Sequence, residues 1–135
     1  MDRRTFLLSS SATTAIATLS SIAQATENSS LPPKNLIFTE KNGGKWRSKK
    51  GTHVPKFEIN GRIVKVNTDH GQSEYHYIVR HTLLLEDGTM VGAKTFMFND
   101  APMSEYELPV GYKGRIIATS FCNKHDLWLA ETYIG

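Results

Sequence analysis

The sequence of 135 residues has one cysteine, a nearly balanced charge and no long hydrophobic run. A single cysteine excludes a framework of intramolecular disulfides. The formal net charge of +3, from 16 Lys and Arg against 13 Asp and Glu, is too small for the strong basic patch of a nucleic-acid-binding protein, so we expect no nucleic-acid partner. A transmembrane helix needs about 20 strongly apolar residues, and we expect no membrane anchor.

The first 25 residues have the layout of an export signal. Arg3 and Arg4 precede Thr-Phe-Leu and a mildly apolar stretch, which contains eight Ser or Thr from Ser9 to Ser21 and ends at Ala23-Gln24-Ala25. The arginine pair resembles a twin-arginine signal, whose pathway moves folded proteins. We therefore expect residues 1–25 to be a twin-arginine signal peptide and the mature protein to be periplasmic or otherwise exported.

The rest of the chain is predicted to form one β domain. Residues 26–34 are polar and end in a Pro pair, which indicates a linker before a domain at 35–135. Turn-marked segments rich in β-branched and aromatic residues predict about seven strands, with hairpin turns at Asn60-Gly61 and Asp87-Gly88. The expected strands are 56–59, 62–66, 75–85, 89–98, 105–110, 115–121 and 127–134. This all-β pattern, without helical periodicity, favours an antiparallel β-sandwich.

Four histidines and the cysteine fall in predicted loops or at strand ends. They are His53, His70, His76, Cys122 and His125, the last two in a Cys-x-x-His spacing that is a weak signal alone. A thiolate with imidazoles suits iron, copper or zinc, and does not suit magnesium or calcium. Structural zinc takes four ligands with more thiolate, so five candidates predict a five-coordinate site with an open position.

His81 is expected to lie outside that site. Side chains alternate faces along a strand without a bulge, which places His76 on one face and His81 on the other. We therefore interpret His81 as a surface or hydrogen-bonded histidine. Trp46 and Trp128 are expected in core or rim packing, with shielding of the site as the alternative for Trp128.

The pattern from about Gly44 to Trp128 resembles the superoxide reductase family of the neelaredoxin type, which is also the iron domain of desulfoferrodoxin. The family's closing signature, Cys-Asn-x-His-Gly-x-Trp, matches residues 122–128 except that Asp126 replaces the glycine. The resemblance implies an immunoglobulin-like sandwich with one mononuclear non-haem iron. The implied ligands are four equatorial imidazoles and an axial thiolate opposite an open sixth position: His53, His70, His76, His125 and Cys122.

The resemblance also implies an activity, the one-electron reduction of superoxide to hydrogen peroxide. An outside electron donor, expected to be a small redox protein, would restore the electron. Association of the chain into a homo-oligomer is an open alternative to a monomer. Most members of the family have Glu-Lys where this chain has Gly51 and Thr52. Lys49 and Lys50 lie close by, and either is a candidate for the missing positive charge. No Cys-x-x-Cys pair occurs upstream for a rubredoxin-like domain.

Three other interpretations remain at this point. The absence of the Glu-Lys pair motivates an iron-binding electron-transfer or redox-sensing protein of the same fold, with weak or no superoxide turnover. A cupredoxin-like copper carrier would need a methionine soon after the Cys-x-x-His pair, and none follows His125. If the protein were a metal-free β-sandwich used for binding, the occurrence of the four histidines and the cysteine at these places would be a coincidence.

Overall fold

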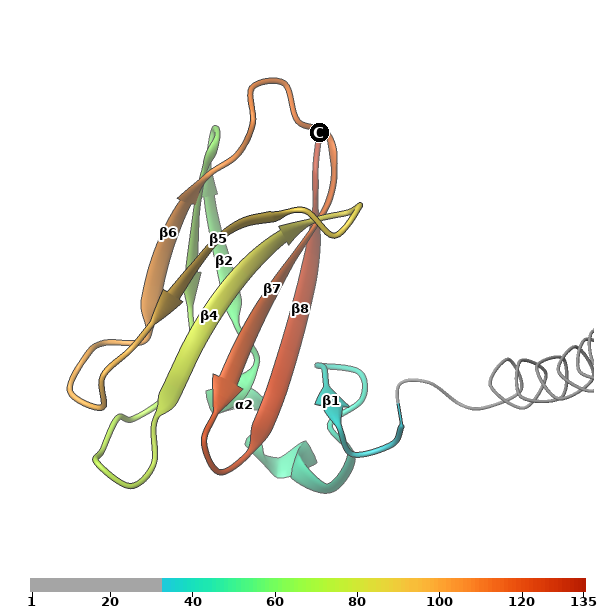
Figure 1. The fold of residues 1–135 in the computed structure, drawn as a ribbon. Helices are drawn as coiled ribbons and strands as arrows, with labels where there is room; N and C mark the ends of the chain where they lie inside the picture. Colours follow the sequence, from blue (N-terminus) through green and yellow to red (C-terminus); the bar gives the residue numbers. More distant parts are fainter. Residues whose placement is uncertain (1–32) are drawn as a thin grey trace, which may run out of the picture. The chain divides into compact units, whose positions relative to one another are not determined.

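The computed structural model describes residues 33–135 and shows a β-sandwich (Figure 1). Within this range there are eight strands and two short helical segments. Their bounds are β1 Ile37–Phe38, η1 Gly44–Lys49, α2 Lys50–His53, β2 Lys56–Asn60, β3 Ile63–Asn67, β4 Ile78–Leu85, β5 Met90–Thr95, β6 Met103–Glu107, β7 Gly114–Cys122 and β8 Asp126–Ile134. The predicted all-β fold is confirmed, with eight strands rather than seven. The expected signal peptide and nearly all of the linker lie outside the described residues.

The strands form two sheets. A five-stranded sheet has the order β1-β8-β7-β4-β5, and a three-stranded sheet has the order β2-β3-β6. All pairs are antiparallel except β1, which pairs in parallel with the start of β8 through Ile37 and Leu127. The unpredicted strand is this two-residue β1.

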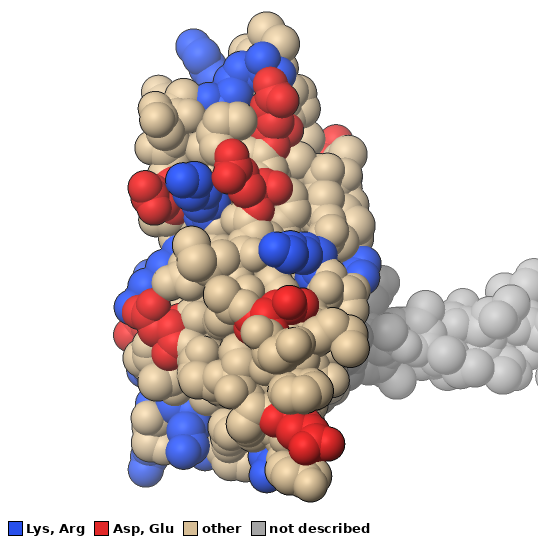
Figure 2. Space-filling view, turned by 90° about the vertical axis from the view of Figure 1, so that its left-hand side faces the viewer, with Lys and Arg blue, Asp and Glu red and all other residues tan. Residues whose placement is uncertain are grey.

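The main core lies between the two sheets. Alternate residues face inward along β6, where Ser104 and Tyr106 are buried between exposed neighbours. The cluster of buried apolar side chains consists of Val64, Val66, Leu83, Leu85, Tyr106, Leu108, Ile116 and Ala118. Basic and acidic side chains are interspersed over the face that carries β6 (Figure 2). Within residues 33–135 no helix has the length and hydrophobicity to cross a bilayer.

The first hairpin turns one residue later than predicted. Asn60 pairs with Ile63, so the two loop residues are Gly61 and Arg62 rather than Asn60 and Gly61. Gly61 has φ +60°, and glycine at the first loop position is the requirement of a type II′ turn.

The prediction of simple alternation along β4 was wrong. His76 lies before the strand, and the ladder shifts register between Ile78 and Arg80. Because of this bulge, Ile78 and His81 both point inward and both are fully buried. His81 Nε2 lies 2.8 Å from Thr68 Oγ1, and its Nδ1 lies 2.8 Å from Ser104 Oγ. The hydrogen-bonded interpretation of His81 is therefore confirmed, although the face argument behind it fails.

Candidate metal centre

All five predicted site residues meet at one end of the sandwich. His53 ends α2, His70 and His76 lie in the loop between β3 and β4, and Cys122 and His125 flank the β7–β8 turn. Figure 1 shows α2, this loop and this turn at the same end of the fold. Because rigid strands hold the loops, side chains distant in sequence are brought to one place.

The segment that carries His53 is helical only briefly. Six residues of 3-10 helix lead into one turn of α-helix, and Val54 N–H donates to Lys50 O at 3.0 Å. Val54 is already extended, with ψ 122°, because the residue before a proline is disfavoured in the helical region. Pro55 thus stops the helix at His53, which is 2% exposed.

The four imidazoles form a square. Ring centroids of neighbours are 4.7 Å apart for His53 and His70, 4.5 Å for His70 and His76, 4.8 Å for His76 and His125, and 4.8 Å for His125 and His53. The diagonal from His53 to His76 measures 6.1 Å. Neighbouring rings lie edge-on, with interplanar angles from 63° to 85°.

The inward nitrogens have the spacing of ligands that share one ion. His70 Nε2 lies 3.1 Å from His76 Nε2, which lies 3.0 Å from His125 Nδ1. Two metal–nitrogen bonds of about 2.1 Å at right angles place their nitrogens about 3.0 Å apart. Within residues 33–135, the buried His53 Nε2 has no hydrogen-bond partner, and a bond to a metal ion would satisfy its lone pair.

Cys122 supplies the sulfur of the cluster. Its side chain is fully buried beside Ile78 and Phe96. Cys122 Sγ lies 3.9 Å from His70 Nε2 and 3.7 Å from His125 Nδ1, two opposite corners of the square. Similar distances to opposite corners are expected for an atom near the axis of the square. The ligand atoms of His53, His70, His76 and Cys122 all lie within 4.8 Å of one another.

Burial and backbone donors act in opposite directions on Cys122. Burial raises the pKa of the thiol, and hydrogen bonds from the backbone N–H groups of Lys124 and His125 lower it. Both donors follow Cys122 in the turn between β7 and β8. They would reduce the electron density that a thiolate gives to a metal.

The histidines are poised as neutral ligands. Burial, followed by the charge of His70, lowers the pKa of His53 to about 4. Burial is also the main cause that lowers the pKa of His70, His76 and His125. Neutral imidazole is the form that binds metals, so at neutral pH no proton has to be removed from the four rings.

Two of the rings are oriented by hydrogen bonds on their outer nitrogens. His53 Nδ1 lies 3.0 Å from Lys49 O, which can only accept, so Nδ1 carries the proton and Nε2 the lone pair. His70 Nδ1 lies 3.1 Å from Gln72 Oε1, and Gln72 is fixed by Ile78 N–H, which donates to the same oxygen at 2.8 Å. Such partners fix ring orientation in metal sites. Gln72 was not predicted, and its position two residues after His70 is the only sequence signal.

Asn123 joins two ligand-bearing loops. Tyr77 N–H donates to Asn123 Oδ1 at 3.0 Å, and Asn123 Nδ2 donates to Tyr75 O at 3.1 Å. The loop on both sides of His76 is thereby tied to the turn that carries Cys122 and His125. This gives a physical reason for the asparagine of the Cys-Asn-x-His motif.

The candidate lysines differ in their relation to the square. The charge of Lys49 lowers the pKa of His76 and His125, as does that of Lys124, a residue that was not predicted. Lys50 is not among the charges that act on these histidines. Thr52 Oγ1 donates to Lys49 O at 3.2 Å and lies 2.9 Å from His53 Nδ1, while Gly51 is exposed.

The predicted tryptophans pack as expected. Trp128 is fully buried against Phe38, and its Nε1 donates to His125 O at 2.8 Å. Trp46 is half-buried against the same cluster. Trp128 also lies against the His53 ring at 5.6 Å between centroids, so it covers one side of the site.

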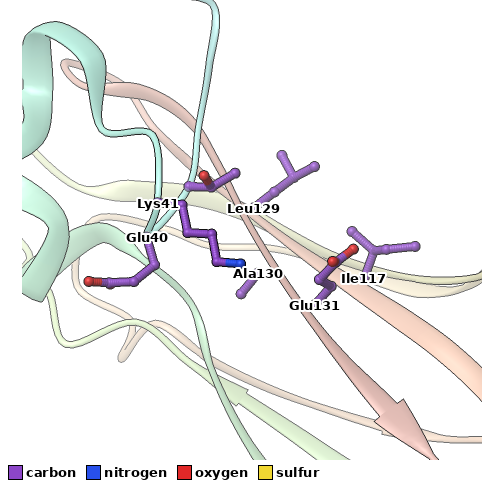
Figure 3. A pocket seen from close by; sticks show the side chains of 7 residues that line it. Glu40, Lys41, Ile117, Leu129, Ala130 and Glu131 are labelled. Atoms are coloured by element: carbon purple, nitrogen blue, oxygen red, sulfur yellow. The ribbon is translucent and has the colours of Figure 1, made fainter.

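A separate pocket of about 490 Å³ lies along β7 and β8 and contains none of the five site residues. Figure 3 shows the loop after β1, with Glu40 and Lys41, beside side chains of the two strands. Its lining consists of Thr39, Glu40, Lys41, Ile117, Leu129, Ala130 and Glu131. These lining residues include no cysteine and no histidine.

The donor set fits one non-haem iron. A buried thiolate and four imidazoles, one with an unpartnered buried nitrogen, match a borderline metal ion and not a hard one. The fold and the site therefore define a β-sandwich protein with a mononuclear thiolate–imidazole metal centre.

The comparison with known proteins narrows this class. Residues 44–131 match the desulfoferrodoxin family, and the chain belongs to it. Among its relatives, the superoxide reductase of Pyrococcus abyssi is 30% identical over 106 residues, which are 67% of this chain and 92% of the relative. The superoxide reductase of Thermococcus kodakarensis is 30% identical over 103 residues, which are 65% of this chain and 90% of the relative. A solved variant of the superoxide reductase (neelaredoxin) from Ignicoccus hospitalis has a TM-score of 0.66 at 30% identity, covering 73% of this chain and 93% of its own.

Proposed function

We propose that this protein is a superoxide reductase that converts superoxide, one electron and two protons into hydrogen peroxide at a single iron site. The ligands would be the four square-forming imidazoles and the buried thiolate: His53, His70, His76, His125 and Cys122. The observation that carries the proposal is the square with 3.0–3.1 Å between inward nitrogens and an unpartnered His53 Nε2.

The iron would supply the electron that superoxide takes up, and the chain's own residues prepare the site for it. The Cys122 thiolate would help to hold the iron and would donate electron density to it, as thiolate ligands do in haem proteins. The imidazoles add no negative charge, so a ferrous iron held by one thiolate would keep a net positive charge that attracts the superoxide anion.

Lys49 would take the place of the lysine that the family has at the position of Thr52. Its positive charge acts on His76 and His125, so it adds to the local field that draws in an anion. Thr52 cannot supply a charge, and its hydroxyl is engaged with Lys49 O and His53 Nδ1. Gly51 has no side chain that could bind the metal.

The second candidate function is electron transfer or redox sensing at the same iron site, with weak or no superoxide turnover. The observation that favours it is the exposed Gly51–Thr52 pair in place of the acid and base of the family. Both functions need an outside redox partner, which would be a small electron-carrying protein.

One measurement separates the two functions. The iron-loaded, reduced protein is mixed with superoxide, and the consumption of superoxide, the yield of peroxide and the release of oxygen are followed together. A reductase forms one peroxide for each superoxide and releases no oxygen, whereas dismutation forms one peroxide and one oxygen from two. Consumption no faster than that of Cys122→Ser would favour the electron carrier.

We also propose that the chain is exported by the twin-arginine pathway and that residues 35–135 form the mature iron domain. Support comes from Arg3 and Arg4 before the Ser- and Thr-rich stretch, and from β1, which pairs with β8 from Ile37 onward. A fusion of residues 1–34 to a reporter that is active only when exported folded tests this. Replacing both arginines by lysine should retain the reporter in the cytoplasm.

A further inference from the structure

Asp126 has a backbone conformation that glycine would adopt more easily. Its φ is +66°, and Asn35 is the one other non-glycine residue of the described chain with a positive φ. Asp126 directly follows His125 and pairs with Cys122 in the β7–β8 ladder, so it closes the turn that carries two site residues. Residues with side chains are strained in this region unless the surroundings hold them.

The Asp126 side chain provides the contacts that hold it there. Trp46 Nε1 donates to Asp126 Oδ2 at 3.0 Å, across 80 positions of sequence. Lys45 Nζ lies 3.8 Å from the same oxygen, between two half-exposed side chains. A hydrogen bond to a carboxylate is stronger than one to a neutral acceptor, so Asp126 fixes the indole more firmly than a neutral residue would.

The indole in turn packs against a site histidine. The rings of Trp46 and His125 lie edge-to-face, with centroids 4.6 Å apart and planes at 86°. The outer nitrogens of His53 and His70 have hydrogen-bond partners, Lys49 O and Gln72 Oε1. Over residues 33–135 no protein group hydrogen-bonds His125 Nε2, so the plane of this ring depends on packing.

We propose that Asp126 is a positioning residue for His125 that acts through Trp46. The carboxylate fixes the indole, and the indole fixes the plane of the imidazole whose Nδ1 faces the other site residues. The inference rests on the proposed iron site, because its consequence is the direction from which His125 Nδ1 approaches the metal. It also explains why a carboxylate occupies a backbone position that glycine would fill with less strain.

Two substitutions at Asp126 separate positioning from a purely structural role. Asp126→Gly relieves the strain of the positive φ and removes the acceptor of the hydrogen bond from Trp46 Nε1. Asp126→Asn keeps an oxygen that can accept this hydrogen bond, and asparagine tolerates positive φ. If Asp126 only shapes the turn, the glycine variant will behave as the parent. If it positions His125, glycine will change the metal site and asparagine will largely restore it. Glu131→Gln, which removes an ion-paired carboxylate from the same strand, is the matched control.

The first readout is the electron paramagnetic resonance and visible spectrum of the oxidised iron protein. We expect Asp126→Gly to change the rhombicity of the ferric signal and shift the thiolate-to-iron band, Asp126→Asn to stay near the parent, and Glu131→Gln to be unchanged. Trp46→Phe should reproduce the glycine spectrum, and the Trp46→Phe, Asp126→Gly double variant should show no further change. Parent spectra in Asp126→Gly and Trp46→Phe, or additive changes in the double variant, would overturn the proposal.

The second readout needs no iron and no turnover. The chain has two tryptophans, so a proton–nitrogen correlation spectrum of the zinc-loaded protein contains two indole signals. Asp126→Gly should shift the Trp46 Nε1–H signal upfield and leave that of Trp128, which donates to His125 O. An unmoved Trp46 signal would contradict the contact itself. Because neither readout uses superoxide, a protein without reductase activity would still give a clear outcome.

Discussion

His81 is expected to make the protein sensitive to mild acid. The side chain is fully buried between Thr68 Oγ1 and Ser104 Oγ, and burial, aided by the charge of Lys94, lowers its pKa to about 4. In the unfolded chain the pKa returns to about 6.5. The unfolded state therefore takes up the proton first. The stability that depends on neutral His81 is complete above about pH 6.5 and is lost as the pH falls towards 4.

The size of the loss follows from the two pKa values. A separation from 6.5 to about 4 corresponds to about 3 kcal/mol at 1.36 kcal/mol per unit, once the pH is below both values. Between pH 7 and pH 5 the same relation gives a decrease of about 2 kcal/mol in the free energy of unfolding.

Urea unfolding of the metal-free protein at pH 7 and pH 5 measures this loss. Because the other four histidines also titrate, the quantity to compare is the difference between the parent and His81→Gln, which has no titrating group at this position. The variant should lose about 2 kcal/mol less than the parent over this interval. Nuclear magnetic resonance titration of the His81 ring in the parent gives its pKa directly, even if the variant unfolds. Equal losses in the two proteins, or a ring pKa near 6.5, would refute the reasoning.

Three further predictions concern the metal site. Cys122→Ser should keep the fold, because the main core lies elsewhere, and should lose the thiolate-to-iron band; an unchanged visible spectrum would contradict the assignment of the sulfur. Gln72→Leu removes the acceptor from His70 Nδ1 and should weaken iron retention by about 10- to 100-fold, the usual effect of losing such a partner, as measured by competition with a chelator. Lys49→Met should slow the reaction with superoxide at low salt more than Lys50→Met does, and equal rate constants in stopped-flow experiments would remove Lys49 from its proposed role.

Most of the fold could be predicted because its information is local. Turn residues and β-branched runs mark the two hairpins and the paired strands β7 and β8, and these strands appear within a few residues of their expected bounds. Strand β1 could not be predicted, since two residues gain strand geometry only by pairing with β8 across the fold. The segment from Gly44 to His53 is mostly 3-10 helix with one α-helical turn, too short for a periodic apolar face.

In the candidate site, too, the features that depend on residue type could be predicted, and those that depend on contacts with other segments could not. The five predicted side chains were recognisable by residue type and by their places in loops, and the structure brings all of them together. Gln72 and Asn123 escaped prediction because their roles depend on groups from other segments, Ile78 N–H and Tyr77 N–H. The error over the alternation in β4 has one cause, a bulge between Ile78 and Arg80 that side-chain patterning does not reveal.

The site residues come from separate segments between His53 and His125, and this spacing has a consequence for the whole chain. An ion held by all of them closes loops that include most of the sandwich. By the chain-entropy relation used for disulfides, closing a loop of that length removes roughly 4 kcal/mol of freedom from the unfolded state. Iron would thus serve this protein as a reversible cross-link in place of the disulfides that a single cysteine rules out. Loss of the metal would then lower the unfolding temperature and also abolish the visible absorption of the protein.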